Sequence, residues 1–116
     1  MARATAAEMV KLFGGTYPPG HDATTFVLFA AQADSIIDTM ALPVTLSTTG
    51  TNEIALANRE AVWLVQRSMW LAAGGVLSGT PEPPWMPEEL RDMLDHLAAS
   101  TTYDGWAVMD LIDEDA

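Results

Sequence analysis

The chain has 116 residues, which suffice for one domain around a single hydrophobic core and exclude two ordinary domains. With 49% hydrophobic and 18% charged residues, the composition is that of a globular protein and excludes a disordered chain. The formal net charge of −11, from 16 acidic and five basic residues, repels nucleic acid and anionic membranes, and it suits a basic partner or a surface that DNA passes without binding.

No cysteine is present, which excludes disulfides, thiol nucleophiles and metal sites built on cysteine. The first residues lack the long apolar core of a signal peptide, and no run of about 18 apolar residues predicts a transmembrane helix. We therefore expect no membrane partner.

The first predicted helix is short and covers residues 6–13. Thr5 and Glu8 have the spacing of a capping box at its start, and Gly14 can adopt the left-handed conformation in which helices often end. The following TYPPG segment is predicted to be a loop, because its prolines lack a backbone donor.

The second predicted helix begins after Asp22 or Thr24, either of which can cap it, and ends near Ala41. Asp34 and Asp38 lie off its apolar stripe, so we predict that they form a solvated face rather than an acid–base pair. The stripe has the spacing of a buried helix face and consists of Phe26, Phe29, Ala30, Ala33, Ile36, Ile37 and Met40.

Residues 43–52, PVTLSTTGTN, predict an extended loop that could include a short strand. A third helix follows over residues 53–73, capped by Thr51 or Asn52 and ended by Gly74. Apolar residues cover so much of its circumference that this helix should be central in the core or shared with a neighbouring chain.

Two tryptophans and two arginines share one flank of the third predicted helix, namely Arg59, Trp63, Arg67 and Trp70. Tryptophans on a helix flank can complete a core, and they can also anchor an interface, where Trp and Arg are enriched. Because two of the five basic residues fall on this helix, we assign the four residues to a candidate subunit interface, with the core as the alternative.

A stiff, proline-rich connector, SGTPEPPWMP, precedes the fourth predicted helix. Pro87 is tolerated in a first helical turn, and Glu88 and Glu89 favour a helix start. The inner face of this helix consists of Leu90, Met93, Leu94, Leu97 and Ala98, after which residues 100–102 lead into the tail.

The C-terminal segment, TTYDGWAVMDLIDEDA, is apolar for a chain end and finishes in acidic residues. It has no helix-period stripe and is too short to form a stable helix alone, so we predict an extended tail. The tail either folds back on its own bundle or, as we favour, docks on another protein as an added strand. The candidate partner-binding residues are Tyr103, Trp106, Val108, Met109, Leu111 and Ile112.

Together these elements predict an all-α fold, a small helical bundle of three main helices plus a short N-terminal helix. The bundle domain covers residues 1–102, and residues 103–116 form a C-terminal docking tail.

No residue pattern in the chain predicts catalysis. His96 lies four residues after Asp92 and could touch it on a helix, but a metal site needs further ligands at compatible positions. The glycine-rich segments lack the lysine of a phosphate-binding loop, and the serines lack a nucleophile-elbow pattern. We therefore expect no enzymatic activity, no catalytic residue, no metal and no cofactor.

The order of helices and loops carries a resemblance to a known family. FVLFAAQADSIIDTMAL has the form F-x2-F-A-x2-A-D-x-I-I-D and precedes a Thr/Gly-rich loop. IALANREAVWLVQRSMW is then a long helix with an alanine-rich start and a tryptophan at its far end, and a short helix and a C-terminal tail follow. Over roughly residues 4–100, this layout resembles the head–tail connector (adaptor) proteins of tailed bacteriophages.

The resemblance implies a structural, non-enzymatic subunit, with about twelve copies in a ring beneath the portal protein. The lumen of such a ring is a conduit through which DNA passes without specific binding. Residues 103–112 occupy the position of the C-terminal hook that grips the portal, and residues 43–52 that of a loop facing the lumen or the downstream tail or neck protein. The implied location is the neck of the virion, after assembly in the host cytoplasm.

The alternative function is that of an acidic regulatory or DNA-mimic protein that binds a basic surface of an enzyme. The two functions differ in stoichiometry. A ring subunit joins many copies of itself, whereas an inhibitor binds its target as a monomer or dimer.

Overall fold

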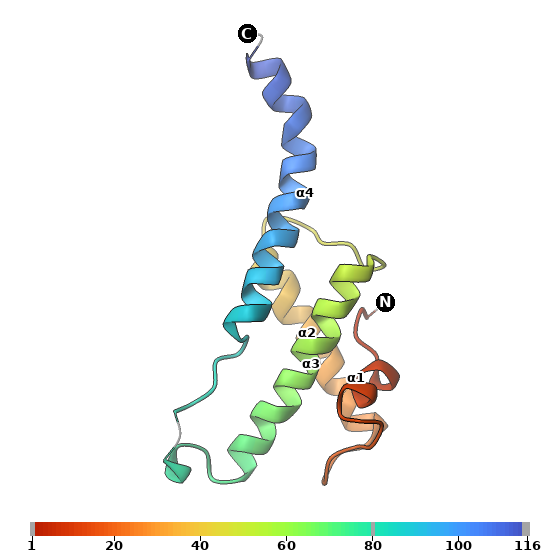
Figure 1. The fold of residues 1–116 in the computed structure, drawn as a ribbon, viewed down its shortest axis with the longest axis vertical. Coiled ribbons are helices and arrows are strands. Elements are labelled where there is room, and N and C mark those ends of the chain that lie inside the picture. The colour runs from red at the N-terminus through yellow and green to blue at the C-terminus, as the bar shows by residue number, and fades with distance from the viewer. Residues whose placement is uncertain (1, 80, 115–116) are drawn as a thin grey trace.

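The computed structural model describes the backbone of residues 2–79 and 81–114, and the side-chain environments up to Thr101 except at Val76 and Ser78. In this part the chain forms α1 (Ala6–Leu12), α2 (Ala23–Ala41), α3 (Thr51–Ala72), a short 3-10 helix η1 (Gly75–Ser78) and α4 (Glu88–Glu114). Figure 1 shows α2 crossing behind α3, with α1 and the first turns of α4 packed beside them. The predicted all-α bundle is confirmed, and no strand occurs among the described residues.

The first two helices begin where their capping residues predict. The Thr5 hydroxyl accepts a hydrogen bond from the Glu8 amide at 3.3 Å and starts α1. At α2, the Asp22 carboxylate accepts from the Thr25 amide, and the Thr25 hydroxyl accepts from the Asp22 amide, both at 3.0 Å. α2 ends at Ala41, as predicted from the proline two residues later.

The third helix begins two residues earlier than predicted, at Thr51, and its N-cap is Gly50 rather than a polar side chain. The Ser47 hydroxyl accepts hydrogen bonds from the amides of Thr49 at 3.1 Å and Gly50 at 2.9 Å. The Gly50 carbonyl already accepts from the Ile54 amide at 2.9 Å. These bonds fix the loop that leads into the helix, and no side-chain hydrogen bond caps α3, so the cap predicted at Thr51 or Asn52 is wrong.

The fourth helix is longer than predicted, because α4 continues to Glu114 and includes backbone that the prediction assigned to the extended tail. A helix already nucleated on a bundle adds one hydrogen bond for each residue it fixes, whereas the prediction treated the tail as an isolated segment. The side chains of the predicted partner-binding set lie outside the described residues, so their docking stays a prediction. This set is Tyr103, Trp106, Val108, Met109, Leu111 and Ile112.

The core draws on all four α-helices. Its largest fully buried apolar side chains are Phe26, Met9, Ile37, Leu56, Leu94 and Val65. The ring of Tyr17 meets that of Phe26 edge-on at a centroid distance of 4.9 Å, so the loop after α1 closes one end of the core. In the described part of the chain, no helix is long and apolar enough to cross a membrane.

Candidate functional site

Arg67 on α3 holds the connector, residues 81–87, against the bundle. This side chain is only 7% exposed. Its Nη2 donates to Glu82 Oε1 at 2.8 Å and its Nε donates to the Pro83 carbonyl at 3.2 Å. The guanidinium also stacks over Trp85, with Cζ 3.6 Å from the ring centroid. One buried cation thus fixes three successive parts of the connector.

The other members of the predicted interface set differ in their surroundings. Trp63 Nε1 donates to the Pro84 carbonyl at 2.8 Å, and its ring packs against the core. Trp70 lies beside the chain turn after α3, since a Cβ added at Gly75 would lie 3.6 Å from its ring. Arg59 is exposed and donates to the Met93 thioether at 3.6 Å.

Contacts within the chain account for Trp63 and Arg67 of this set. Trp63 and Arg67 bind the connector of their own chain, a role that the periodicity of one helix cannot reveal. The sequence contains the segment that these two residues bind, the proline-rich stretch PEPPW. Because this stretch forms no helix, its backbone carbonyls need hydrogen-bond donors from another part of the chain. The subunit-interface role of Arg59, Trp63, Arg67 and Trp70 stays a prediction.

We expect Arg67→Ala to lower the free energy of unfolding by about 2–3 kcal/mol, because it removes a charge-assisted hydrogen bond, a carbonyl partner and the stack on Trp85. Arg67→Lys should recover only part of this, since an ammonium lacks the planar fork. The measurement is urea denaturation. Arg91→Ala is the control, because its ion pair with Asp95 is solvent-exposed and should be worth less than about 1 kcal/mol. Equal losses for the two alanine variants would contradict the clamp.

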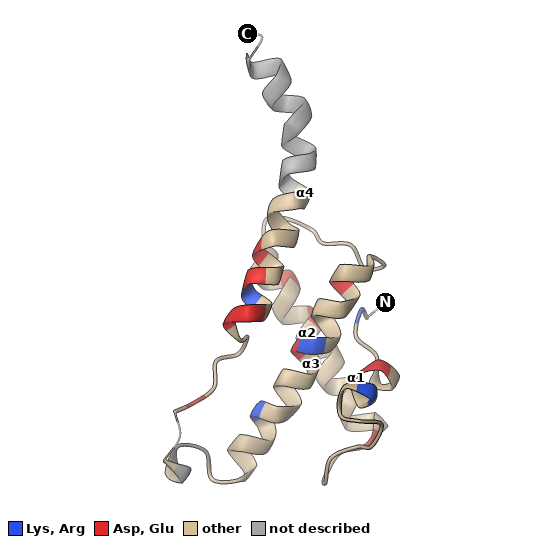
Figure 2. Cartoon of the chain, in the orientation of Figure 1, with Lys and Arg blue, Asp and Glu red and all other residues tan. Residues whose placement is uncertain are grey.

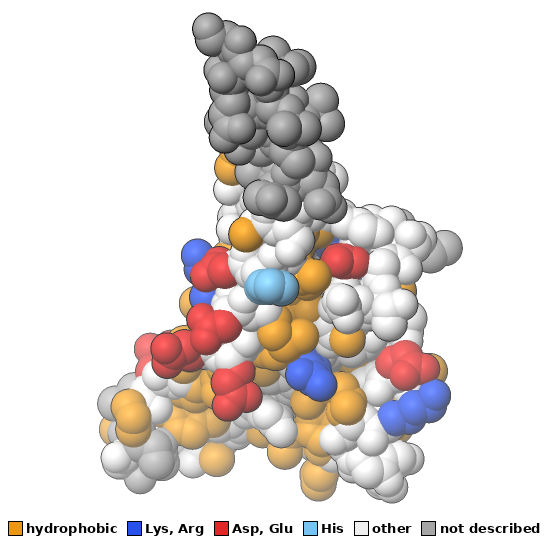
Figure 3. All heavy atoms as spheres, turned by 45° about the horizontal axis from the view of Figure 1, so that its top comes forward, with side chains coloured by type: hydrophobic (Ala, Val, Ile, Leu, Met, Phe, Trp, Pro, Cys, Tyr) orange, Lys and Arg blue, Asp and Glu red, His pale blue; other side chains and the backbone are white. Residues whose placement is uncertain are grey.

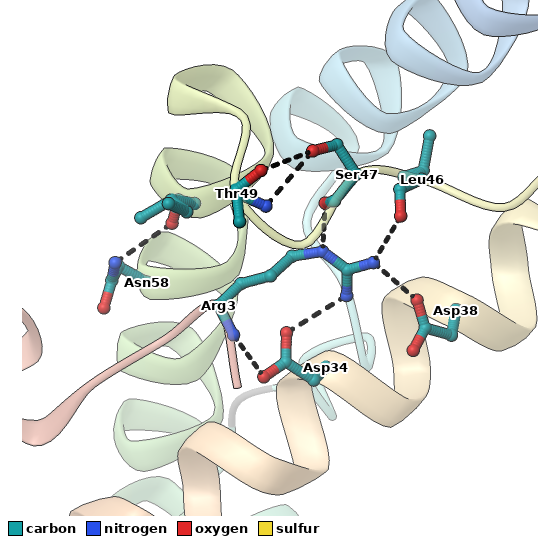
Figure 4. A network of polar contacts seen from close by, with 8 residues as sticks. Arg3, Asp34, Asp38, Leu46, Ser47, Thr49 and Asn58 are labelled. Atoms are coloured by element: carbon teal, nitrogen blue, oxygen red, sulfur yellow. Dashed lines mark hydrogen bonds and ion pairs between the residues drawn. The ribbon is translucent and has the colours of Figure 1, made fainter. Parts of the chain in front are cut away.

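Arg3 is the centre of a second polar network, shown in Figure 4. The residue is 4% exposed, and its guanidinium contacts Asp34 at 3.2 Å and Asp38 at 2.9 Å, both on α2. It also donates to the carbonyls of Leu46 at 3.0 Å and Ser47 at 2.8 Å, while its own amide donates to Asp34 at 2.9 Å. Each guanidinium nitrogen of Arg3 therefore has a hydrogen-bond partner.

The prediction that Asp34 and Asp38 form a solvated face is wrong for Asp34, whereas Asp38 is exposed but paired. The Asp34 side chain is only 15% exposed and both carboxylates bind Arg3, although the Asp38 side chain remains 58% exposed. The spacing of the two aspartates was read correctly as one helix face. Their cation comes from 31 and 35 residues away, so no local pattern identifies it.

The N-terminal arm, residues 2–5, ties three elements together. Beyond the contacts of Arg3 with α2 and the loop, the Thr5 amide donates to Asn58 Oδ1 on α3 at 3.1 Å. Asn58 is 6% exposed and donates in turn to the Ile54 carbonyl at 3.0 Å. The arm therefore fixes the loop of residues 43–50 relative to both long helices.

Glu60 lies in the middle of α3 and is fully buried. Neither carboxyl oxygen has a hydrogen-bond partner among the described residues. Burial in apolar surroundings raises its pKa from 4.5 to about 8. The residue lines neither of the two grooves described below.

Two shallow grooves lie on the bundle surface. One, of about 340 Å³, is mostly apolar and lies between α2 and the connector; it is lined by Gln32, Ser35, Ile36, Thr39, Met40 and Trp85. The other, of about 320 Å³, lies between α1 and α3 and is lined by Glu8, Lys11, Leu12, Thr51, Ile54, Ala55, Asn58 and Arg59.

The first turns of α4 carry an exposed acidic cluster, Glu88, Glu89, Asp92 and Asp95, which Figures 2 and 3 show in red. Asp92 and His96, the pair considered for chemistry from their spacing, are both solvent-exposed. Within the described residues, no group of three or more His, Cys, Asp and Glu side chains could hold a metal ion. This part of α4 is therefore an exposed, negatively charged surface.

No protein-family model, curated protein or solved structure matches this chain.

Proposed function

We propose that this chain is a structural head–tail connector (adaptor) subunit of a tailed bacteriophage, one of about twelve copies in a ring beneath the portal. In this role it binds the portal protein, its neighbouring copies and a downstream tail or neck protein. DNA passes through the ring without specific binding. The chain works in the neck of the virion and carries out no catalysis.

The observation that supports this role best is the fixed loop between two long helices. The layout that resembles the connector family has such a loop between its second and third helices, facing the lumen or the next component. Here residues 43–50 are held by Arg3, and Leu46 is buried at 2% exposure. A loop fixed in this way presents the same surface from every copy of a ring.

The charge distribution agrees with the same role. The exposed acidic cluster on the first turns of α4 repels phosphates, which dominate sequence-independent affinity for DNA. The core residues that α4 contributes in the described part lie between Leu90 and Leu97.

The acidic cluster also favours the second candidate, an acidic regulatory or DNA-mimic protein that binds a basic surface of an enzyme. Glu88, Glu89, Asp92 and Asp95 present exposed carboxylates on two successive helical turns. Such a surface could imitate a run of phosphates. The number of copies in the bound state separates the two functions.

The test is electron microscopy of particles from cells infected with a phage that carries this gene. With the full chain we expect complete particles with a ring of copies at the neck. With a chain truncated after Thr102 we expect separate heads and tails, because the portal-binding segment is missing. The truncated bundle should melt nearly as the full chain does. Particles without this chain at the neck would contradict the proposal, and a one-to-one complex with an enzyme would favour the DNA-mimic function.

A further inference from the structure

Arg59 is the one basic residue that forms no ion pair in the described part of the chain. All five basic residues lie in that part. The other four each pair with a carboxylate, and they are Arg3, Lys11, Arg67 and Arg91. The Arg59 side chain is exposed, and its guanidinium donates to the Met93 thioether, a weak acceptor, at 3.6 Å. The charge of Arg59 is therefore available to a carboxylate from another molecule.

Arg59 lines the groove of about 320 Å³ between α1 and α3. Lys11 on α1 lines it as well, so the groove holds two of the five basic residues of the chain. Its one acidic residue, Glu8, pairs with Lys11 at 3.0 Å, which leaves the charge of Arg59 unbalanced. Leu12, which is 54% exposed, adds apolar surface. The groove is thus a positively charged, partly apolar surface on a chain whose formal net charge is −11.

The exposed acidic cluster at the start of α4 lies on the other side of the bundle from α1. These two helices each pack on α2 and α3, and in the described part they do not contact each other. Figure 2 shows the red turns of α4 on the left and α1 on the right, with α3 between them. Glu88 and Asp92 are four residues apart and share one face of α4, and neither forms an ion pair among the described residues. This acidic face and Arg59 thus both lack an opposite charge within the described structure.

Two different surfaces of opposite charge on one chain favour a head-to-tail contact between copies. In such a contact the acidic face of one copy meets the groove of the next, and contacts of this kind close into rings when the rotation between copies closes. The net charge does not prevent this, because charges more than about 8 Å apart are largely screened at physiological ionic strength. The charges that meet at the contact then decide which surfaces bind.

We propose that the groove between α1 and α3 binds the acidic start of α4 of a second copy, with the Arg59 guanidinium pairing with the carboxylates of that face. The inference rests on the proposed function, because a ring requires each copy to bind two neighbours. Within the predicted interface set, it gives Arg59 the direct contact. Trp63 and Arg67 act indirectly, since they hold the connector that leads into the acidic face.

The experiment measures self-association of the full chain by sedimentation equilibrium over a wide concentration range. Arg59→Glu should weaken association at least about thirty-fold, the factor expected when a charge pair at a contact is lost, and added salt should weaken the wild-type association. Asp92→Arg should weaken association in the same direction. Both residues are exposed, so both variants should keep the fold, which melting curves check. Arg91→Glu is the matched control: it makes the same change of net charge at an exposed arginine outside the groove and should not weaken association.

Mixing the two interface variants tests the pairing itself. Each variant alone brings like charges together at the contact, whereas in the mixture Arg59 of one chain meets Asp92 of the other, and the two substituted residues also have opposite charges. The mixture should therefore recover most of the wild-type association. Two weakened variants that do not complement each other would overturn the inference, because the two residues would then belong to different contacts.

The remaining outcomes separate this inference from the proposed function. If the wild-type chain associates and Arg59→Glu associates equally well, the groove is the wrong surface, while a ring formed through another surface remains supported. If the wild-type chain is monomeric at every concentration, the inference is overturned, and particle microscopy still decides the connector function. If the variants complement each other but particles lack this chain at the neck, the groove is supported and the connector function is contradicted.

Discussion

Glu60→Gln is expected to stabilise the chain at pH 9 by on the order of 4 kcal/mol and to change its stability little at pH 4.5. Glu60 is fully buried, and neither carboxyl oxygen has a partner in the described structure. Burial raises the pKa of this carboxyl from 4.5 to about 8, which means that the folded chain strongly prefers the neutral form.

The sign of the pH dependence follows from proton uptake. Below pH 4.5 the Glu60 carboxyl is protonated in both the folded and the unfolded chain, so its ionisation contributes nothing. Between pH 4.5 and about 8 the unfolded chain loses this proton and the folded chain keeps it. The free energy of unfolding therefore falls by about 1.4 kcal/mol per pH unit, and above pH 8 the full deficit remains. Glutamine keeps the shape and cannot ionise.

The measurement is a series of urea denaturation curves from pH 5 to pH 9. The wild-type chain should lose stability over this range, and the Glu60→Gln curve should be flatter by the slope above. Asp92→Asn is the control, because it removes an exposed carboxylate from α4 and leaves Glu60 in place. If Glu60→Gln keeps the wild-type slope, the buried carboxyl is not the group responsible.

The sequence predicts the helices well because their causes are local. Asp22 and Thr25 close a capping box within four residues, and the apolar stripe of α2 can be read at helical spacing. The end of α2 follows from Pro43 in the same way. At α3 no side chain caps the helix, and its first residue lies two positions before the predicted one.

The buried charges could not be predicted, because their partners are distant in sequence. Arg3 meets Asp34 and Asp38 across more than 30 residues, and Arg67 meets Glu82 across 15. Composition offers one hint, since a chain with only five basic residues can place each beside an acid. The burial of Glu60 cannot be predicted from its neighbours in sequence. Its helix is apolar on several sides, and a glutamate there is expected at the edge of the apolar face, where it can reach water.

The contacts of the candidate interface residues are likewise distant in sequence. The subunit-interface role predicted for the α3 flank stays a prediction, and Trp63 and Arg67 bind a proline-rich segment. That segment belongs to the same chain, which helix spacing cannot tell.

Arg3→Ala is expected to lower the free energy of unfolding by about 3–5 kcal/mol, the largest loss of any single substitution considered. Removing the cation leaves two neighbouring carboxylates, of which Asp34 is largely buried, without a counter-charge. It also leaves the carbonyls of Leu46 and Ser47 without their donor. The loop of residues 43–50 then loses its attachment to α2.

Urea denaturation measures the global effect, and hydrogen exchange measures the local one. The amides of Thr49 and Gly50, which donate to Ser47 Oγ, should exchange faster in Arg3→Ala, because the loop that holds Ser47 is released. Lys11→Ala is the matched control: it also removes a paired cation near the N-terminus, but its ion pair with Glu8 is exposed and should be worth less than about 1 kcal/mol. An Arg3→Ala chain with the stability of Lys11→Ala and an unchanged loop would show that the arm does not fix the loop. Faster loop exchange with little global loss would instead mean that Arg3 positions the loop without supporting the bundle.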